Sequence, residues 1–186
     1  MNVHELFWRE RRQRAYLKLF PGLFMAATEL SAGAIAVATR NADRILGKDS
    51  GRLAIFQVKT KDEIFDPFER ETDRLTRSVK IPVDFIVSNP PYLAERNEAD
   101  SDVLNHEPGT ALFAPEGDPL YFYRKIVEGA EAYLRPHGYL FFECPHERIE
   151  KISHLFRADW RVELFKDLTG RPRVIRAEWK GISVLN

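Results

Sequence analysis

Cysteine is almost absent from this sequence of 186 residues, in which Cys144 is the only one. A single cysteine excludes an internal disulfide and any thiolate cluster for zinc or iron–sulfur. Cys144 and the histidines at positions 106, 137, 146 and 154 also lack the spacing of metal ligands. We therefore expect no metal site, and a reducing, intracellular compartment is the simpler interpretation.

Net charge is absent too, because lysine plus arginine and aspartate plus glutamate each number 28. A chain without a basic excess has no net field that would draw it to nucleic acid or to an anionic membrane. No apolar run reaches the length that a bilayer requires. These absences predict a soluble protein that does not bind a membrane. They also disfavour nucleic acid as a partner.

What the sequence does contain, from about residue 23 onward, is an alternation of apolar runs with helical patterns. This alternation is typical of a largely parallel α/β sheet. Helices are expected at 32–46 after the N-cap Ser31, at 118–134 after Asp118 and Pro119, and between residues 143 and 160, with a polar loop over 94–117. A short polar turn joins the last two strands, which predicts an antiparallel pair. The expected strands are residues 23–28, 52–58, 83–88, 139–143, 160–165 and 174–179.

The third of these strands ends in Asn89, Pro90, Pro91 and Tyr92. Proline has no backbone N–H, so this segment offers hydrogen-bond acceptors on a stiff backbone. The Asn89 side-chain oxygen and the Pro90 carbonyl are suited to bind a planar NH2 group while Tyr92 stacks against it. Asn-Pro also opens many ordinary turns, so the segment alone is equally consistent with a turn. Its place after a central strand favours a site, because ligands bind there in open α/β sheets.

Three stretches carry a resemblance to a known family. The string DFIVSNPPYL resembles the signature of class I S-adenosylmethionine-dependent amino-methyltransferases, which methylate adenine N6 or a glutamine amide. The strings EPGTALFAPEGDPLYFYRKIVEGAEAYLRPHGYLFFE and KDLTGRPRVIRA are similar to the C-terminal half of the HemK/PrmC release factor glutamine methyltransferases. The resemblance as a whole covers roughly residues 24–180, which is most of the chain.

The resemblance implies that Asn89, Pro90 and Tyr92 are the catalytic residues. With Pro91, they would bind the amide of a glutamine in the Gly-Gly-Gln motif of a peptide chain release factor, the implied protein partner. It also implies the cofactor S-adenosyl-L-methionine.

For that cofactor, the resemblance implies contacts from Glu29 to the two ribose hydroxyls, from Asp62 or Glu63 to the adenine, and from Asn89. A carboxylate suits two hydroxyl donors. The alternative for Glu29 is an exposed charge at a helix entry. For two further carboxylates, Glu107 and Glu143, we expect structural support and no direct chemistry.

The glycine-rich loop of the family, of the form DLGTGSG, has no counterpart here, since no two of the ten glycines are separated by a single residue. Residues 1–20 have a helical pattern. We therefore expect an α/β, Rossmann-like class I methyltransferase sheet that is mostly parallel, has an antiparallel C-terminal strand pair, and lacks the first strand and the glycine-rich loop. The expected organisation is a single partial methyltransferase domain over residues 1–186 without a separate N-terminal substrate domain.

The leading hypothesis for function is N5-methylation of a release factor glutamine. An adenine N6-methyltransferase acting on DNA or RNA is the alternative enzyme, which the balanced charge disfavours. A third alternative is a noncatalytic pseudo-methyltransferase or fragment, whose partner protein completes the sheet. The resemblance allows a cytoplasmic or a mitochondrial location.

Overall fold

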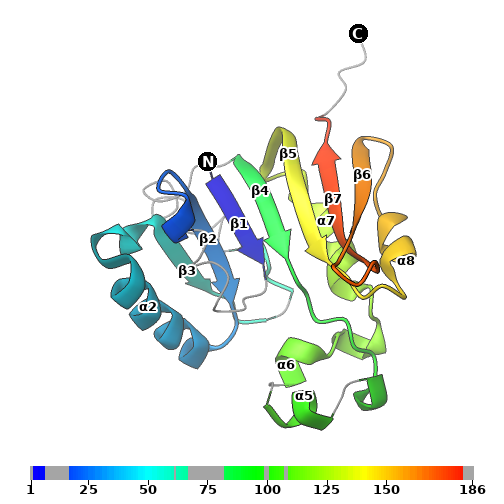
Figure 1. The fold of residues 1–186 in the computed structure, drawn as a ribbon, viewed down its shortest axis with the longest axis horizontal. Coiled ribbons are helices and arrows are strands. Elements are labelled where there is room, and N and C mark those ends of the chain that lie inside the picture. Colours follow the sequence, from blue (N-terminus) through cyan, green and yellow to red (C-terminus); the bar gives the residue numbers. More distant parts are fainter. Residues whose placement is uncertain are drawn as a thin grey trace.

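The computed structural model describes residues 2–6, 17–60, 62–66, 82–98, 101–106 and 109–181. Seven strands form one sheet in the order β3-β2-β1-β4-β5-β7-β6 (Figure 1). The strands are β1 (Asn2–Leu6), β2 (Phe24–Glu29), β3 (Leu53–Gln57), β4 (Val83–Ser88), β5 (Leu134–Glu143), β6 (Trp160–Lys166) and β7 (Pro172–Trp179). The α-helices are α2 (Ala32–Leu46), α5 (Ser101–His106), α6 (Gly109–Leu112), α7 (Tyr121–Ala130) and α8 (Ile149–Ser153), and the 3-10 helices are η1 (Gly47–Arg52), η2 (Arg96–Glu98) and η3 (Pro115–Gly117).

The sheet confirms the expected α/β class. Neighbouring strands from β3 to β5 are parallel, and β7 pairs antiparallel with both β5 and β6. The strand order reverses between β1 and β4, which is the point in an open α/β sheet where ligands bind. In Figure 1 the parallel strands end at the lower edge of the sheet, where α5 and α6 also lie.

The prediction that the sheet lacks its first strand is wrong. Asn2–Leu6 forms β1 at the centre, where its backbone pairs in parallel with β2 and with β4. The expected helix over residues 1–20 is correspondingly wrong for these five residues, and residues 17–19 are helical. The pairing joins segments far apart in the chain and satisfies the backbone edges of β2 and β4, so a short local pattern does not reveal it. Residues 7–16, where a cofactor loop would follow β1, lie outside the described residues.

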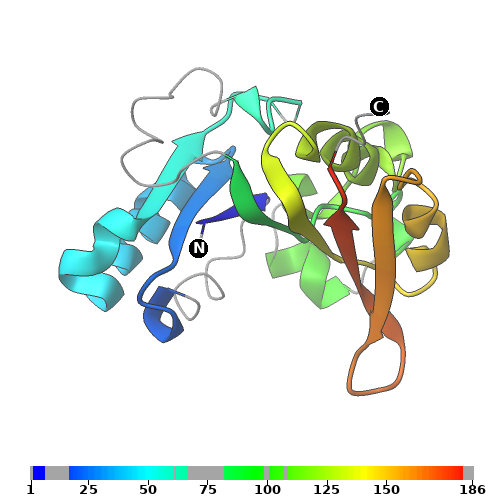
Figure 2. The same cartoon turned by 90° about the horizontal axis from the view of Figure 1, so that it is seen from above.

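The main core lies between the sheet and α7, which is behind β5 and β7 in the view of Figure 1 and above them in Figure 2. The spacing of apolar residues in α7 places one continuous side of the helix against the strands. Its buried residues are Phe122, Tyr123, Ile126, Val127 and Ala130. They pack with strand residues such as Ile86, Leu140 and Phe142, each fully buried. This packing fixes β4 and β5, and with them the segment that leaves β4.

Several strand bounds differ from the sequence-based expectation by one or two residues, and two regions differ more. The polar stretch 94–117 is not a plain loop, because it contains η2, α5, α6 and η3. Helix α7 is shorter than expected and ends at Ala130, and Leu134 already pairs with Val83 at the start of β5. The RPHG sequence is an irregularity inside β5, where His137 has a φ of 63°. Leu134 fits the apolar spacing of the helix, but the sheet is the partner that buries it.

In the part of the chain that the structure describes, no helix combines the length and the apolar character that a membrane span requires.

Candidate active site

The segment Asn89–Pro90–Pro91–Tyr92 leaves the end of β4 and is held at both of its ends. On one side it continues β4, whose Ser88 pairs with β1 and β5. On the other side Leu93 forms a parallel bridge with Phe113. The Leu93 N–H donates to the Leu112 carbonyl (3.1 Å), and the Ala114 N–H donates to the Leu93 carbonyl (2.9 Å). Two anchored ends and two consecutive proline rings leave this segment little conformational freedom.

Within this segment the two prolines are buried, whereas Asn89 and Tyr92 are only half-buried. Among the described residues, none forms a hydrogen bond with the Asn89 amide or with the Tyr92 hydroxyl. An amide that is partly exposed and has no partner among the described residues can present its oxygen as an acceptor to a ligand. The geometry therefore offers the acceptor that the sequence predicts at Asn89.

Beneath Tyr92 the core contains two ionisable groups that stay neutral. The Tyr123 hydroxyl donates to the Glu143 carbonyl (3.0 Å), and burial raises the pKa of Tyr123 well above its usual range. Burial likewise raises the pKa of the neighbouring Cys144 to about 12. Tyr92 itself packs against this core. Both groups are uncharged at neutral pH, so they support the segment by packing and not by charge.

Glu29 ends β2 and caps the entry to α2. Its Oε1 accepts the Ser31 N–H at 2.7 Å, and the Ser31 hydroxyl in turn accepts the Ala34 N–H at 3.2 Å, as an N-cap should. Among the described residues Oε2 has no hydrogen-bond partner. One carboxylate oxygen thus fixes the side chain while the other is available for a hydroxyl.

The register of the sheet relates Glu29 to Asn89. Leu6 of β1 pairs with Thr28 on one side and with Ser88 on the other, so Glu29 and Asn89 are each the next residue along their strands. Two strand spacings separate their backbones, which corresponds to about 10 Å. The sheet therefore brings these two predicted site residues to the same edge, on either side of the end of β1.

Asp62 and Glu63 follow β3 at this edge, and both already have protein partners. The Asp62 carboxylate accepts from the Tyr121 hydroxyl and lies 3.9 Å from Lys125 Nζ. The bond to Asp62 is the main cause that raises the pKa of Tyr121, to about 12. Glu63 Oε2 accepts the Lys59 N–H at 3.0 Å, closing its own turn. Of the two, Asp62 is tied to α7 and Glu63 to the loop.

Three further residues are relevant to this edge: Glu107, Glu143 and Ser88. Glu107 lies outside the described residues, and Glu143 is half-buried at the end of β5. Ser88, which the sequence did not single out, is 1% exposed, and its hydroxyl has no hydrogen-bond partner among the described residues. A buried hydroxyl without a partner is costly. Only its position immediately before Asn89 could have drawn attention to it.

Comparison with known sequences gives a consistent set of relatives. The chain is 41% identical over 98 residues to a release factor glutamine methyltransferase of Bacteroides thetaiotaomicron, a match that covers 50% of this chain and 35% of that protein. It is 37% identical over 161 residues to one of Cereibacter sphaeroides, covering 84% and 51%. It is 35% identical over 159 residues to a bifunctional methyltransferase of Rickettsia felis, covering 83% and 27%. The chain thus spans about half of the length of these relatives or less, and no family model matches it.

Solved structures share the fold at low sequence identity. A methyltransferase from Pyrococcus furiosus superposes with a TM-score of 0.58 at 17% identity, covering 97% of this chain and 75% of that one. TrmN from Thermus thermophilus superposes with a TM-score of 0.60 at 16% identity, covering 96% and 44%. By sequence the chain is therefore a relative of the release factor glutamine methyltransferases, and its fold is that of the class I methyltransferases.

Proposed function

We propose that this chain transfers a methyl group from S-adenosyl-L-methionine to the side-chain nitrogen of a glutamine in a peptide chain release factor. The observation that carries the proposal is the Asn89–Tyr92 segment, rigid and rich in acceptors, at the topological switch point of a methyltransferase sheet. The names of the relatives support the release factor as substrate.

The acceptor segment would orient the nitrogen that reacts. A glutamine amide has two N–H groups, which the Asn89 side-chain oxygen and the Pro90 carbonyl would accept, while the Tyr92 ring covers one face of the amide. With both protons bound, the lone pair of the nitrogen points in one direction, and electron density is drawn toward it. As the nitrogen forms its bond to the methyl carbon, the bond from that carbon to sulfur would break, the electron pair would stay on the sulfur, and one N–H proton would be lost to solvent. Pro91 contributes by keeping the backbone fixed and by adding no donor that would compete.

Glu29 ends β2 and Asn89 follows β4, on either side of the end of β1, and Asp62 and Glu63 belong to the loop that follows β3. An extended nucleoside cofactor would lie across these strand ends. The carboxylate oxygen of Glu29 that has no partner among the described residues is suited to the ribose hydroxyls. S-Adenosylmethionine would supply a methyl carbon attached to a positively charged sulfur. Residues 1–186 would then act as one methyltransferase domain.

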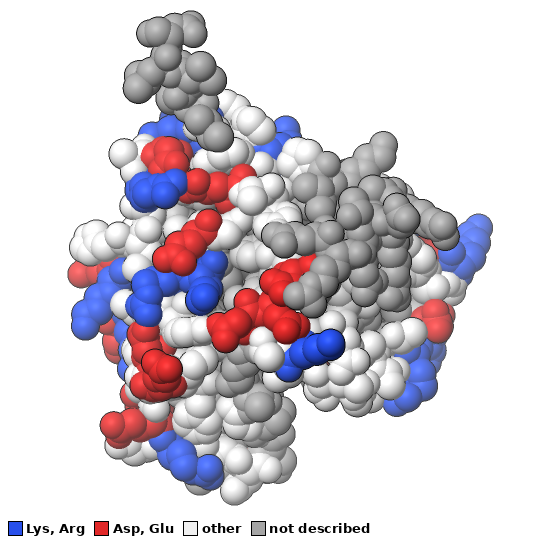
Figure 3. All heavy atoms as spheres, turned by 180° about the vertical axis from the view of Figure 1, so that it is seen from behind, with Lys and Arg blue, Asp and Glu red and all other residues white. Residues whose placement is uncertain are grey.

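Surface charge supports a protein substrate over a nucleic acid. On the face shown in Figure 3, acidic and basic side chains of the described residues are interspersed, and neither sign forms a continuous field. A nucleic-acid interface usually presents a basic stripe or patch. The described residues on this face form no such stripe or patch.

The first test is isothermal titration of the purified chain with S-adenosylmethionine, after circular dichroism shows that the chain is folded. We expect micromolar binding, followed by addition of one methyl group to a release factor that mass spectrometry locates on a glutamine. A folded chain that binds no cofactor and transfers no methyl group would contradict the proposal and favour a noncatalytic role.

A further inference from the structure

The hairpin of β6 and β7 carries an unusual concentration of exposed apolar side chains. Leu164 is 45% exposed, Phe165 is 43% exposed, and Leu168 in the turn is fully exposed at 107%. Leu164 and Phe165 are neighbours in a strand, so their side chains point to opposite faces of the hairpin. A single exposed leucine on a surface needs no explanation, but an apolar group at the tip and on both faces of one projecting hairpin does.

The turn that presents Leu168 is held in one conformation by Asp167. Its Oδ1 accepts from the Thr169 N–H (2.8 Å), the Thr169 hydroxyl (2.6 Å) and the Arg171 N–H (3.1 Å). The Asp167 N–H donates to the Arg171 carbonyl (2.8 Å), and Gly170 takes the φ of 85° that closes the turn. A rigid turn loses little conformational entropy when its tip binds a partner.

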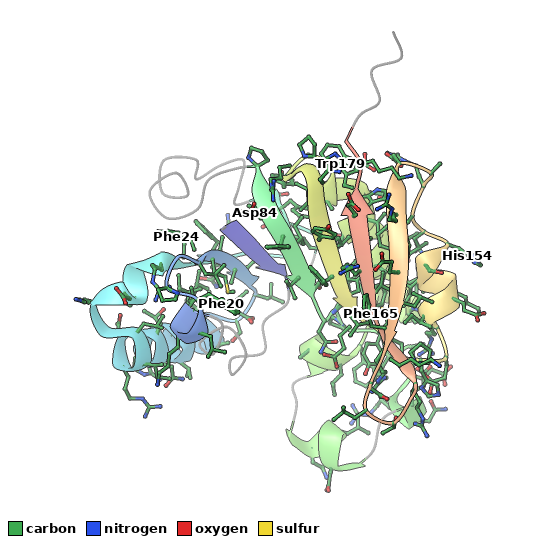
Figure 4. The ribbon with its side chains drawn as sticks, turned by 45° about the horizontal axis from the view of Figure 1, so that its top comes forward. Phe20, Phe24, Asp84, His154, Phe165 and Trp179 are labelled. Carbon is green, nitrogen blue, oxygen red and sulfur yellow. The ribbon has the colours of Figure 1, made fainter. Side chains whose placement is uncertain are left out.

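The hairpin projects from the same edge of the sheet as the Asn89–Tyr92 segment. Ser88 of β4 pairs with Phe142 of β5, and Glu143, the next residue, pairs with Val174 of β7. The turn before Val174 therefore lies beyond the strand ends at this edge. Figure 2 shows the hairpin reaching past the rest of the sheet, and Figure 4 shows Phe165 on it, far from Asp84 and Trp179 at the opposite edge.

Positive charge surrounds the apolar tip. Lys166 and Arg171 are exposed on either side of the turn, and neither pairs with an acidic side chain in the part of the chain that is described. Arg173 lies 3.9 Å from Asp167 and is the turn's own counter-ion. Two cations that flank a leucine favour a partner with an apolar pocket and an acidic rim.

We infer that the tip of this hairpin, Lys166 to Arg171, is a docking element for the protein substrate. Leu168 inserts into an apolar pocket on the folded substrate, away from the glutamine that is methylated, and Lys166 and Arg171 meet acidic side chains around that pocket. The inference rests on the proposed function for the identity of the substrate. It explains how an enzyme that acts on one small amide selects a folded protein, because the tip adds affinity that a short peptide around the glutamine cannot reach.

The test compares Leu168→Glu with Leu19→Glu, the same change at a leucine that is 69% exposed outside the hairpin. Binding of an intact release factor to each variant is measured by titration, and methyl transfer is measured on the intact factor and on a short Gly-Gly-Gln peptide. We expect Leu168→Glu to weaken binding and to raise KM for the intact factor by about tenfold or more, as for a central apolar anchor. Transfer to the peptide should not change, and Leu19→Glu should match the wild type.

Several results would overturn the inference. One is equal binding of the factor by both variants, and another is an equal loss of transfer to factor and peptide, which would place Leu168 in the site itself. Loss of salt-sensitive RNA binding or of self-association in Leu168→Glu, with factor binding unchanged, would assign the tip to a different partner. If the wild type transfers no methyl group but binds the factor more tightly than Leu168→Glu does, docking stands and the proposed function fails.

Discussion

The two faces of the sheet are packed very differently. On the face covered by α7, fully buried residues of β4 and β5 such as Ile86, Leu140 and Phe142 join one large core. On the other face, Phe85, Tyr139 and Phe141 are half-buried, and their rings lie 6.0 to 6.1 Å apart. The tight face holds the strands in register, and the edge between the faces carries the groups proposed to bind ligands. The buried face of these strands therefore provides stability, and the ends of the strands carry the groups proposed for function.

The largest effect should come from truncating the tight face. Phe142→Ala removes a fully buried ring, and we expect it to lower the free energy of unfolding by about 3–5 kcal/mol. Phe141→Ala, at the next position of the same strand, should cost less than half as much, because Phe141 faces the looser side. Urea denaturation of both variants measures the difference. Equal losses would mean that the two faces contribute equally and that the comparison is wrong.

A substitution at the sheet edge should lower the rate of methyl transfer and leave the free energy of unfolding unchanged. Asn89→Ala removes an acceptor from the reacting amide, and we expect the rate of methyl transfer to fall by about 100- to 1000-fold. Urea denaturation should change little, because the Asn89 side chain has no hydrogen-bond partner among the described residues. Asn97→Ala is the matched control, since its amide donates to Glu95 at the surface and to no other described residue. Near-normal turnover of Asn89→Ala would remove Asn89 from the mechanism.

Gly→Ala substitutions in the two long helices, α7 and α2, should differ in their effect on stability. A Cβ at Gly129 of α7 would overlap the ring of Phe65, which stacks on Tyr133 with ring centroids 4.8 Å apart. We expect Gly129→Ala to destabilise the fold by about 1–3 kcal/mol through overpacking. Of the described atoms, Ser31 Oγ at 3.6 Å is the one that a Cβ at Gly33 of α2 would meet, so Gly33→Ala should be tolerated. A thermal melt of both variants checks this, and equal melting temperatures would contradict it.

The smallest effect concerns the link between α7 and the loop after β3. The hydrogen bond to Asp62 raises the pKa of Tyr121 to about 12. A folded-state pKa above the ordinary value of about 10 means that the bond contributes fully below pH 10 and is lost as the pH rises through about 12. Tyrosinate absorbance at high pH also includes the buried Tyr123, whose pKa is raised, so the late step should lose the contribution of one tyrosine in Tyr121→Phe, and that contribution should move to lower pH in Asp62→Asn. A Tyr121 step near pH 10 in the wild type would contradict the assigned bond.

Local patterns in the sequence predict some elements to the residue. The range 32–46 has a side-chain N-cap at its start and a glycine with a φ of 56° at its end, and α2 has those bounds. The largely apolar run at 83–88 likewise becomes β4, a central strand of the sheet. Capping and hydrophobicity decide these elements, and both act over a few residues.

Other features depend on contacts between distant segments. Asn2–Leu6 becomes a strand because β2 and β4 leave a slot between them, and Leu134 joins β5 because Val83 pairs with it. In the site, the sequence predicts the acceptor segment and Glu29, whereas the bond between Asp62 and Tyr121 and the buried Ser88 hydroxyl appear only in three dimensions. The roles of Asn89, Pro90, Pro91, Tyr92, Glu29, Asp62 and Glu63 stay predictions.

Because β1 alone joins β2 and β3 to the other described strands, the sheet consists of two parts connected by five residues. Each part can lose its pairing with β1 without breaking its own ladders, so the molecule is expected to open at this seam before it unfolds globally. Native-state hydrogen exchange would then show the amides of β1 exchanging earlier than those of β5 and β7. A cofactor bound across the end of β1 would contact both parts of the sheet. Its binding would therefore stabilise the closed sheet against opening at β1.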